Sequence, residues 1–538
     1  MYGSVFFGSN KDNDDDNGNS RPLGSQISLP VIPPGEADNA RSTCTTGSKS
    51  STVGPSPLLD ECAEVSKKRG TATMMSCIVN LANTIVGAGM LGLPGAFGGT
   101  GYVGGSILIV LGAFFSSMGL WLLSRAAQRA GLPSSFYSVA HAAVPQYTVL
   151  IDLAVALKCF GVATGYLITV GDCMVDALDH ILLNDKDNDT PTGITKLILT
   201  RQFWVVAAVL AVLPISFYKT LDSLKKTSAI ALIFVLFLAF GIVAYANGLA
   251  DPCLDTEEDV CRGEILPFTD ISTTISKLPI FVFAFTCHQN IFPVVNELAQ
   301  RTQQRLNIII AASIGVALIL FYIVATEGYK TFGSMTRGDV LLNYPETGKV
   351  TILRICIAIM LSLHYPLQLD PSRRCIKSLI REIQRQWNKP NQTGSNPTRL
   401  FHRRTPDLIE QEAEEQEGQP YQCASEESNS HYKQNQELKQ QSANDNDDDD
   451  DTMFYVITIS FLLCSFALAM IVNDLGVILA MVGATGSTLV SYVLPGLIYL
   501  KLHPYQDLSK RLAYLQLGLG CLIMPLALYF VVMQRIKT

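Results

Sequence analysis

The stretch Asn83–Pro94, NTIVGAGMLGLP, lies inside an apolar run that extends from Met74 to Phe97. A run of this length suits a helix that crosses a lipid bilayer, which needs about 20 residues. The quoted stretch nevertheless holds three glycines and a proline, which are the poorest helix formers. An unpaired peptide group inside a membrane costs several kcal/mol. A helix interrupted here therefore indicates that its exposed backbone groups have a function.

The composition is that of a membrane protein. The chain has 538 residues, of which 48% are hydrophobic and 16% charged, and its mean hydropathy is +0.26. Its net charge of −7 comes from acidic residues concentrated in tails and loops, so we expect no nucleic-acid partner. The cysteines and histidines lack the spacing of a metal site. We find no catalytic constellation or phosphate-binding loop, and we expect neither an enzyme nor a bound cofactor.

Hydropathy predicts an all-α integral membrane protein with eleven transmembrane helices. We expect a disordered cytosolic tail over 1–70, helices 1–8 over 71–370, a long polar and partly disordered cytosolic loop over 371–452, and helices 9–11 over 453–538. The spans are expected at about 74–97, 103–124, 149–176, 202–217, 228–247, 275–295, 306–327, 350–370, 453–472, 475–500 and 512–533.

Lysine and arginine clusters recur between alternate pairs of spans, which predicts a cytosolic N-terminus and a non-cytosolic C-terminus. Two features of the predicted non-cytosolic loops agree with this orientation. Asn188 begins a glycosylation sequon, and Cys253 and Cys261 share one loop, where they form a disulfide or stay free. The basic segment after 370 is either an amphipathic surface helix or an extension of the eighth span.

A second interruption is expected five spans after the first, where the polar stretch Thr286–Asn290, TCHQN, precedes Pro293. Because five is odd, a five-span repeat places its second copy upside down, so spans 1–5 and 6–10 form inverted repeats with an eleventh span appended. Broken helices at matching positions indicate a transporter binding site. Exposed N–H groups suit a carboxylate, and exposed carbonyls suit a cation. The alternatives are close glycine packing or a simple kink, and an interhelical hydrogen-bond patch.

Four blocks of sequence resemble the amino acid/auxin permease family, especially its sodium-coupled neutral amino acid transporters and their vacuolar relatives. They are NLANTIVGAGMLGLPGAF (80–97), FAFTCHQNIFPVVNEL (283–298), YPLQLDPSRR (365–374) and MVGATGSTLVSYVLPGLIYLKL (481–502). The resemblance implies a five-plus-five inverted repeat whose helices 1 and 6 are discontinuous. It also implies amino acid transport driven by Na⁺ or H⁺ across a plasma, vacuolar or lysosomal membrane.

The resemblance further assigns site residues. The substrate carboxylate is expected at Gly87, Ala88 and Gly89. The ammonium and side chain are expected at Phe285, Thr286, Cys287 and His288. A coupling cation is expected at Asn83, the Val86 carbonyl and Ser362, whereas His364 stands where relatives carry a small hydroxyl residue and suggests proton coupling.

Two matters stay open at this level. A sensor that binds amino acids with little flux would use the same site, and it would signal to cytosolic partners through the N-terminal tail or the 371–452 loop. Few charges fall inside the spans, and two of them, Asp152 and Lys158, share the third span. Such residues usually face protein or water, either in a structural role or along the transport path.

Overall fold

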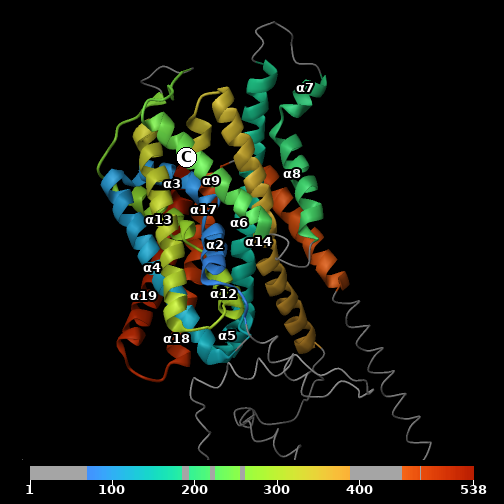
Figure 1. The fold of residues 1–538 in the computed structure, drawn as a ribbon, viewed down its shortest axis with the longest axis vertical. Helices are drawn as coiled ribbons and strands as arrows, with labels where there is room; N and C mark the ends of the chain where they lie inside the picture. The colour runs from blue at the N-terminus through green and yellow to red at the C-terminus, as the bar shows by residue number, and fades with distance from the viewer. Residues whose placement is uncertain are drawn as a thin grey trace, which may run out of the picture. The chain divides into compact units, whose positions relative to one another are not determined.

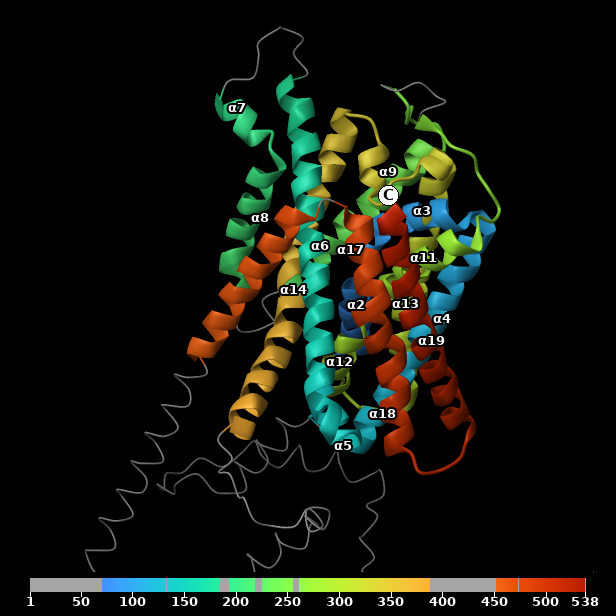
Figure 2. The same cartoon turned by 180° about the vertical axis from the view of Figure 1, so that it is seen from behind.

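The computed structural model describes residues 70–131, 133–183, 193–217, 225–254, 261–387, 451–472 and 474–537. These residues form helices and connecting loops and contain no named strand, so the chain is all-helical where it is described (Figures 1 and 2). The predicted N-terminal tail, the Asn188 sequon and most of the 371–452 loop lie outside the described residues.

Most of the helices that the structure describes match the expected apolar segments. In chain order the elements are α2 (Met74–Ile85), α3 (Gly89–Thr100), α4 (Tyr102–Ala130), α5 (Phe136–Ala143), α6 (Thr148–Leu183), α7 (Gly193–Ile198), α8 (Arg201–Ser216), α9 (Lys225–Ala246), α11 (Ile271–Ala284), η4 (His288–Asn290), α12 (Ile291–Glu297), α13 (Gln303–Phe332), η6 (Val340–Asn343), α14 (Gly348–Trp387), the helix Asp451–Ile471, α17 (Leu475–Val482), η8 (Gly483–Ser487), η9 (Leu489–Val493), α18 (Leu494–Leu502) and α19 (Leu508–Lys537).

Within the described residues, eight helical stretches are long and apolar enough to cross a membrane, and α2 with α3 makes a ninth if this bent pair is one span. The expected fourth and fifth spans correspond to shorter apolar helices, α8 and α9. α8 has 16 residues, fewer than the roughly 20 that a perpendicular span requires. α14 runs on to Trp387, so the basic segment after 370 continues the eighth helix in the structure.

Basic side chains gather at one end of the helix bundle, which we call the basic end. Arg125 on α4 donates to Ser509 Oγ at 3.1 Å, and Arg129 donates to the Leu502 carbonyl at 3.1 Å. Figure 2 shows α5, the turn between α18 and α19, and the end of α14 at this end, whereas α19 ends at the opposite one. The last turns of α14, which lie at this end, carry Arg374, Lys377 and Arg381.

The opposite end is held by ion pairs and a disulfide. Cys253 and Cys261 are joined by a disulfide bond in the loop before α11. Arg201 Nε lies 2.6 Å from Asp172 Oδ1, which ties α8 to α6. The same arginine donates to the Ala469 carbonyl at 3.0 Å and so reaches the helix Asp451–Ile471. This end of the bundle is therefore cross-linked between helices that are distant in sequence.

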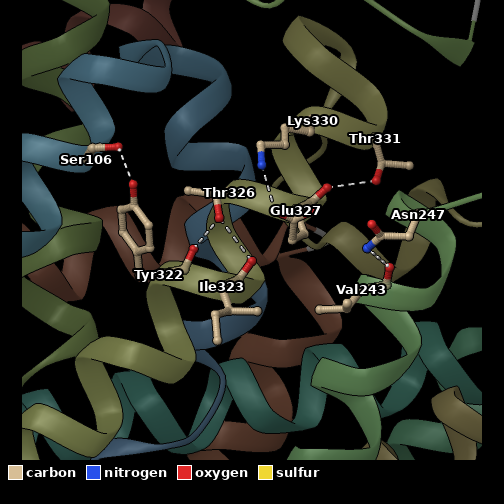
Figure 3. A network of polar contacts seen from close by, with 9 residues as sticks. All are labelled: Ser106, Val243, Asn247, Tyr322, Ile323, Thr326, Glu327, Lys330 and Thr331. Atoms are coloured by element: carbon tan, nitrogen blue, oxygen red, sulfur yellow. Dashed lines mark hydrogen bonds and ion pairs between the residues drawn. The ribbon is translucent and has the colours of Figure 1, made fainter.

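Polar residues on α13 near the opposite end are satisfied locally (Figure 3). Thr326 Oγ1 donates to the Tyr322 carbonyl at 2.7 Å, and Lys330 Nζ lies 2.8 Å from Glu327 Oε1. The only bond drawn there between distant helices joins Tyr322 Oη to Ser106 Oγ on α4 at 3.5 Å. A hydroxyl that bonds back to its own helix needs no partner elsewhere. Glu327 likewise forms its ion pair within α13, with Lys330, and not with the interrupted helices.

Candidate substrate site at two broken helices

The first predicted interruption is confirmed. α2 ends at Ile85, Val86 adopts an extended conformation, and α3 restarts at Gly89 with a bend of 53° between the two helices. Among the described residues, the backbone N–H groups of Gly87, Ala88 and Gly89 have no hydrogen-bond acceptor. They are the orphan donors expected where a helix restarts. All three residues are buried, so these donors lie inside the protein.

The second interruption is also present, and two of the carbonyls near it accept hydrogen bonds from hydroxyl groups. α11 ends at Ala284, and the chain is not α-helical again until Ile291. Ser116 Oγ on α4 donates to the Phe285 carbonyl at 2.7 Å. Thr286 Oγ1 donates to the Val282 carbonyl at 2.7 Å. Hydroxyl groups of Ser116 and Thr286 thus bond two carbonyls at the second break.

The two breaks lie against each other. A Cβ atom built on Gly89 would stand 3.0 Å from Ala284 Cα and 3.3 Å from the Phe283 ring, so only glycine allows the backbones to approach this closely. A side-chain hydrogen bond also joins the two broken helices, because Asn290 Nδ2 on η4 donates to Thr84 Oγ1 on α2 at 2.9 Å. The structure therefore brings together the two groups of predicted substrate residues, which are about 200 residues apart in sequence.

Several residues around the breaks were missed by sequence reasoning. Tyr166 on α6 points at the first break, since its Oη would lie 2.9 Å from a Cβ atom on Gly87. Gln368 Nε2 on α14 donates to that hydroxyl at 3.5 Å. Ser491 Oγ, on the tenth predicted span, donates to Thr286 Oγ1 at 3.0 Å. A polar residue in an otherwise apolar span was the available signal, but many such residues bond only to their own helix.

The tenth predicted span contains two π-helical segments where it faces the second break. η8 and η9 follow one another from Gly483 to Val493. Gln516 Nε2 on α19 donates to the Ser491 carbonyl at 2.9 Å, so one wide turn has a side-chain partner. π-Helical turns occur frequently at functional sites, and this one borders the candidate substrate site.

His288 and Lys158 add polar groups beside the second break. His288 is buried, and neither ring nitrogen has a hydrogen-bond partner among the described residues. Its Nε2 would stand 2.6 Å from a Cβ atom on Gly119, so the bare glycine on α4 makes room for the ring. Lys158 on α6 is also buried, and it packs against Gly486 of η8. The two ring nitrogens of His288 are available to a polar ligand between the breaks.

The predicted cation ligands are only partly assembled. Asn83 is buried, and its Oδ1 lies 3.3 Å from His364 Nε2. Ser362 Oγ donates to the Ala358 carbonyl of its own helix at 2.8 Å. Oxygen atoms from an amide, a carbonyl and a hydroxyl suit a hard cation. The structure, however, pairs Asn83 with the histidine that departs from the family pattern, and no contact joins Asn83 to Ser362.

The fold and this pair of broken helices define a membrane carrier, and the sequence comparisons identify its family. The model of the family described as "Transmembrane amino acid transporter protein" matches residues 70–536, and the chain belongs to that family. It is therefore a multi-pass membrane protein of a transporter family rather than an enzyme, and its expected partners are an amino acid and membrane lipid.

Individual relatives carry matching names. The chain is 34% identical over 453 residues to "Vacuolar amino acid transporter 5" of Schizosaccharomyces pombe, covering 83% of this chain and 88% of the relative. It is 29% identical over 511 residues to "Vacuolar amino acid transporter 7" of Saccharomyces cerevisiae, covering 86% and 99%. A more distant relative is "Putative sodium-coupled neutral amino acid transporter 11" of Danio rerio, 25% identical over 323 residues, covering 58% and 67%.

Proposed function

We propose that this chain is a secondary active transporter of neutral amino acids that works by alternating access. One observation carries the proposal: the N–H groups of Gly87, Ala88 and Gly89 are buried without an acceptor among the described residues, and Gly89 packs against the second broken helix. A helix start with free donors attracts a carboxylate. The second break, with Phe285, Thr286, Cys287 and His288, then receives the ammonium and side chain. The named relatives are transporters, so the sensor alternative is not favoured.

We propose that the membrane domain has eleven spans in a five-plus-five inverted repeat. The bent pair α2–α3 would be span 1, and α11 with η4 and α12 would be span 6. Short helices such as α8 can complete a bundle where neighbouring helices shield their ends. Two breaks five spans apart support this arrangement. The vacuolar membrane is the proposed location, because two of the relatives are named as vacuolar.

The coupling ion is proposed to be Na⁺ or H⁺, and the structure supports each in a different way. Asn83 and the Val86 carbonyl offer oxygen ligands suited to Na⁺. Against this, His364 Nε2 lies 3.3 Å from Asn83 Oδ1, so a bound Na⁺ would have to compete with that hydrogen bond. A proton-driven carrier needs no cation ligands at this place.

Uptake by the purified protein in liposomes tests the function. We expect uptake of neutral amino acids when a Na⁺ gradient or a pH gradient is imposed. We expect no uptake when neither gradient is present. If Na⁺ drives transport, Asn83→Ala should raise the Na⁺ concentration for half-maximal uptake, and high Na⁺ should partly restore substrate affinity because linkage is reciprocal. If H⁺ drives it, replacing Na⁺ by choline should leave uptake intact, and His364→Ala should flatten its pH dependence. Flux that responds to neither gradient would contradict the proposal.

Opposite sidedness of two tags tests the topology. α14 ends at the basic end, whereas α19 ends at the opposite end, and the positive-inside rule makes the basic end cytosolic. A tag after Thr538 should therefore be protected from protease in intact vacuoles, and a tag inserted near Gly394 should be cleaved. The same tags in detergent-opened vacuoles, where both should be cleaved, are the control. Two tags on the same side would mean that an even number of spans separates them, whereas our proposal places helices 9–11 between them.

A further inference from the structure

A cavity of about 550 Å³ opens at the basic end, beside the second broken helix. Its walls come from the segment before α5, from α6, from η4 with α12, and from the last turns of α14. Cavities of this size commonly hold small organic ligands. The cavity contains none of the residues predicted to bind substrate, so it is separate from the candidate site between the breaks.

Two buried side chains in the wall have polar atoms without partners. Asp152 on α6 is 1% exposed, and its Oδ1 makes no hydrogen bond within the described residues. Gln289 on η4 is 6% exposed, and neither its Oε1 nor its Nε2 is bonded there. A buried polar group without a partner costs about 1–3 kcal/mol, and more when it is charged. Both residues are thus placed to receive a polar ligand.

The charges around the cavity select the class of ligand. Asp152 and Glu297 contribute negative charge from α6 and α12, and Arg374, Lys377 and Arg381 contribute positive charge from α14. A simple anion would be repelled by the buried Asp152 carboxylate, whose Oδ1 has no partner among the described residues, and a simple cation by the bases of α14, of which Arg374 is paired with Asp370. A zwitterion satisfies both walls, with its ammonium at Asp152 Oδ1 and its carboxylate toward Gln289 Nε2.

We propose that this cavity is a second amino acid binding site, through which substrate passes between the broken helices and the basic end. This inference rests on the proposed transport function. Gln289 adjoins His288 of the second break, so the two sites meet at one short helical turn. The rings of Phe136 and Phe292, 4.9 Å apart, lie in contact beside the site and add an apolar wall for the substrate side chain.

Binding stoichiometry tests this second site. The probe is the neutral amino acid with the fastest uptake in the liposome series, radiolabelled and measured by equilibrium dialysis against the purified full-length protein. Wild type should bind one more equivalent of amino acid per chain than Asp152→Asn. If both bind two equivalents, wild type should bind the second about tenfold more tightly, as expected for one charge-assisted hydrogen bond. Gln289→Ala should lose the same equivalent. An analogue without the ammonium group should not compete for it.

Glu264→Gln is the matched control, because it removes a carboxylate from an exposed residue that does not line the cavity. It should bind as wild type does. Asp152→Asn removes a buried charge and should fold, which its thermal melting can verify. Equal stoichiometry and affinity in wild type and both cavity variants would overturn the second site, as would an equal loss in Glu264→Gln. A wild type that transports no amino acid would instead refute the proposed function.

Discussion

Gly87→Val is expected to abolish amino acid uptake while leaving near-normal amounts of protein in the membrane. A Cβ atom at Gly87 would stand 2.9 Å from Tyr166 Oη and have no closer neighbour. Since that atom is the far end of a side chain, Tyr166 can move aside and the fold can tolerate the change. The branched valine would, however, occupy the space beside the free N–H groups where the substrate carboxylate is proposed to bind.

The comparison with Gly89→Val separates the site from the fold. At Gly89 the new Cβ atom would meet the Ala284 backbone at 3.0 Å, so α3 and α11 would have to move apart. We therefore expect lower protein levels as well as lost uptake. Gly315→Val is the control, because nothing lies within 4 Å of a Cβ atom built on this α13 glycine. Uptake should be measured per folded protein, and normal uptake by Gly87→Val would show that the first break does not hold the carboxylate.

Arg354→Met is expected to lower the stability of the chain by several kcal/mol, about 1–3 for each buried carbonyl that loses its donor. Arg354 is 2% exposed, and its Nη2 donates to the carbonyls of Leu341 and Tyr344 at 3.2 and 3.1 Å. The same nitrogen lies 3.3 Å from Asp176 Oδ2. Asp176 is 31% exposed, so most of the loss comes from the two carbonyls that lose their donor, at about 1–3 kcal/mol for each buried group left unpaired. Membrane levels and thermal melting in detergent should both fall, whereas Arg337→Met, at a more exposed arginine nearby, should change neither.

The double variant Arg354→Met, Asp176→Leu provides the sharper test. Asp176→Leu removes the carboxylate that Arg354→Met leaves without its partner, so the double variant should regain part of the lost melting temperature. No recovery would mean that the two backbone carbonyls, rather than the ion pair, account for the loss.

A neighbouring carboxyl adds a pH dependence to this loss. Burial, followed by the charge of Asp172, raises the pKa of Asp339 from 3.8 to about 7, and Arg354 opposes that rise. Because the folded state holds this proton more tightly than the unfolded state, stability falls as the pH rises from 3.8 toward 7 and then levels. Without Arg354 the fall should continue to a higher pH and be larger in total, so Arg354→Met should be relatively less damaging at pH 5 than at pH 8.

Local sequence was sufficient to predict the helices and both breaks. The interruption after Ile85 follows from closely spaced glycines, and the interruption at Thr286 follows from a polar stretch inside an apolar span. These are properties of short segments, because helix propensity and hydrophobic length depend on neighbouring residues. The shorter α8 and the extension of α14 to Trp387 were less well predicted, since the ends of helices depend on packing.

Only the tertiary structure showed which side chains meet. The bond from Asn290 to Thr84, the position of Tyr166 at Gly87, and the shared cavity of Asp152 and Gln289 all join segments distant in sequence. A hydropathy pattern gives the length of a membrane helix, but it does not give the helix's rotation or its depth relative to neighbours. Those two quantities are set by side-chain packing between helices. They decide whether a buried polar residue faces its own backbone, another helix or a ligand.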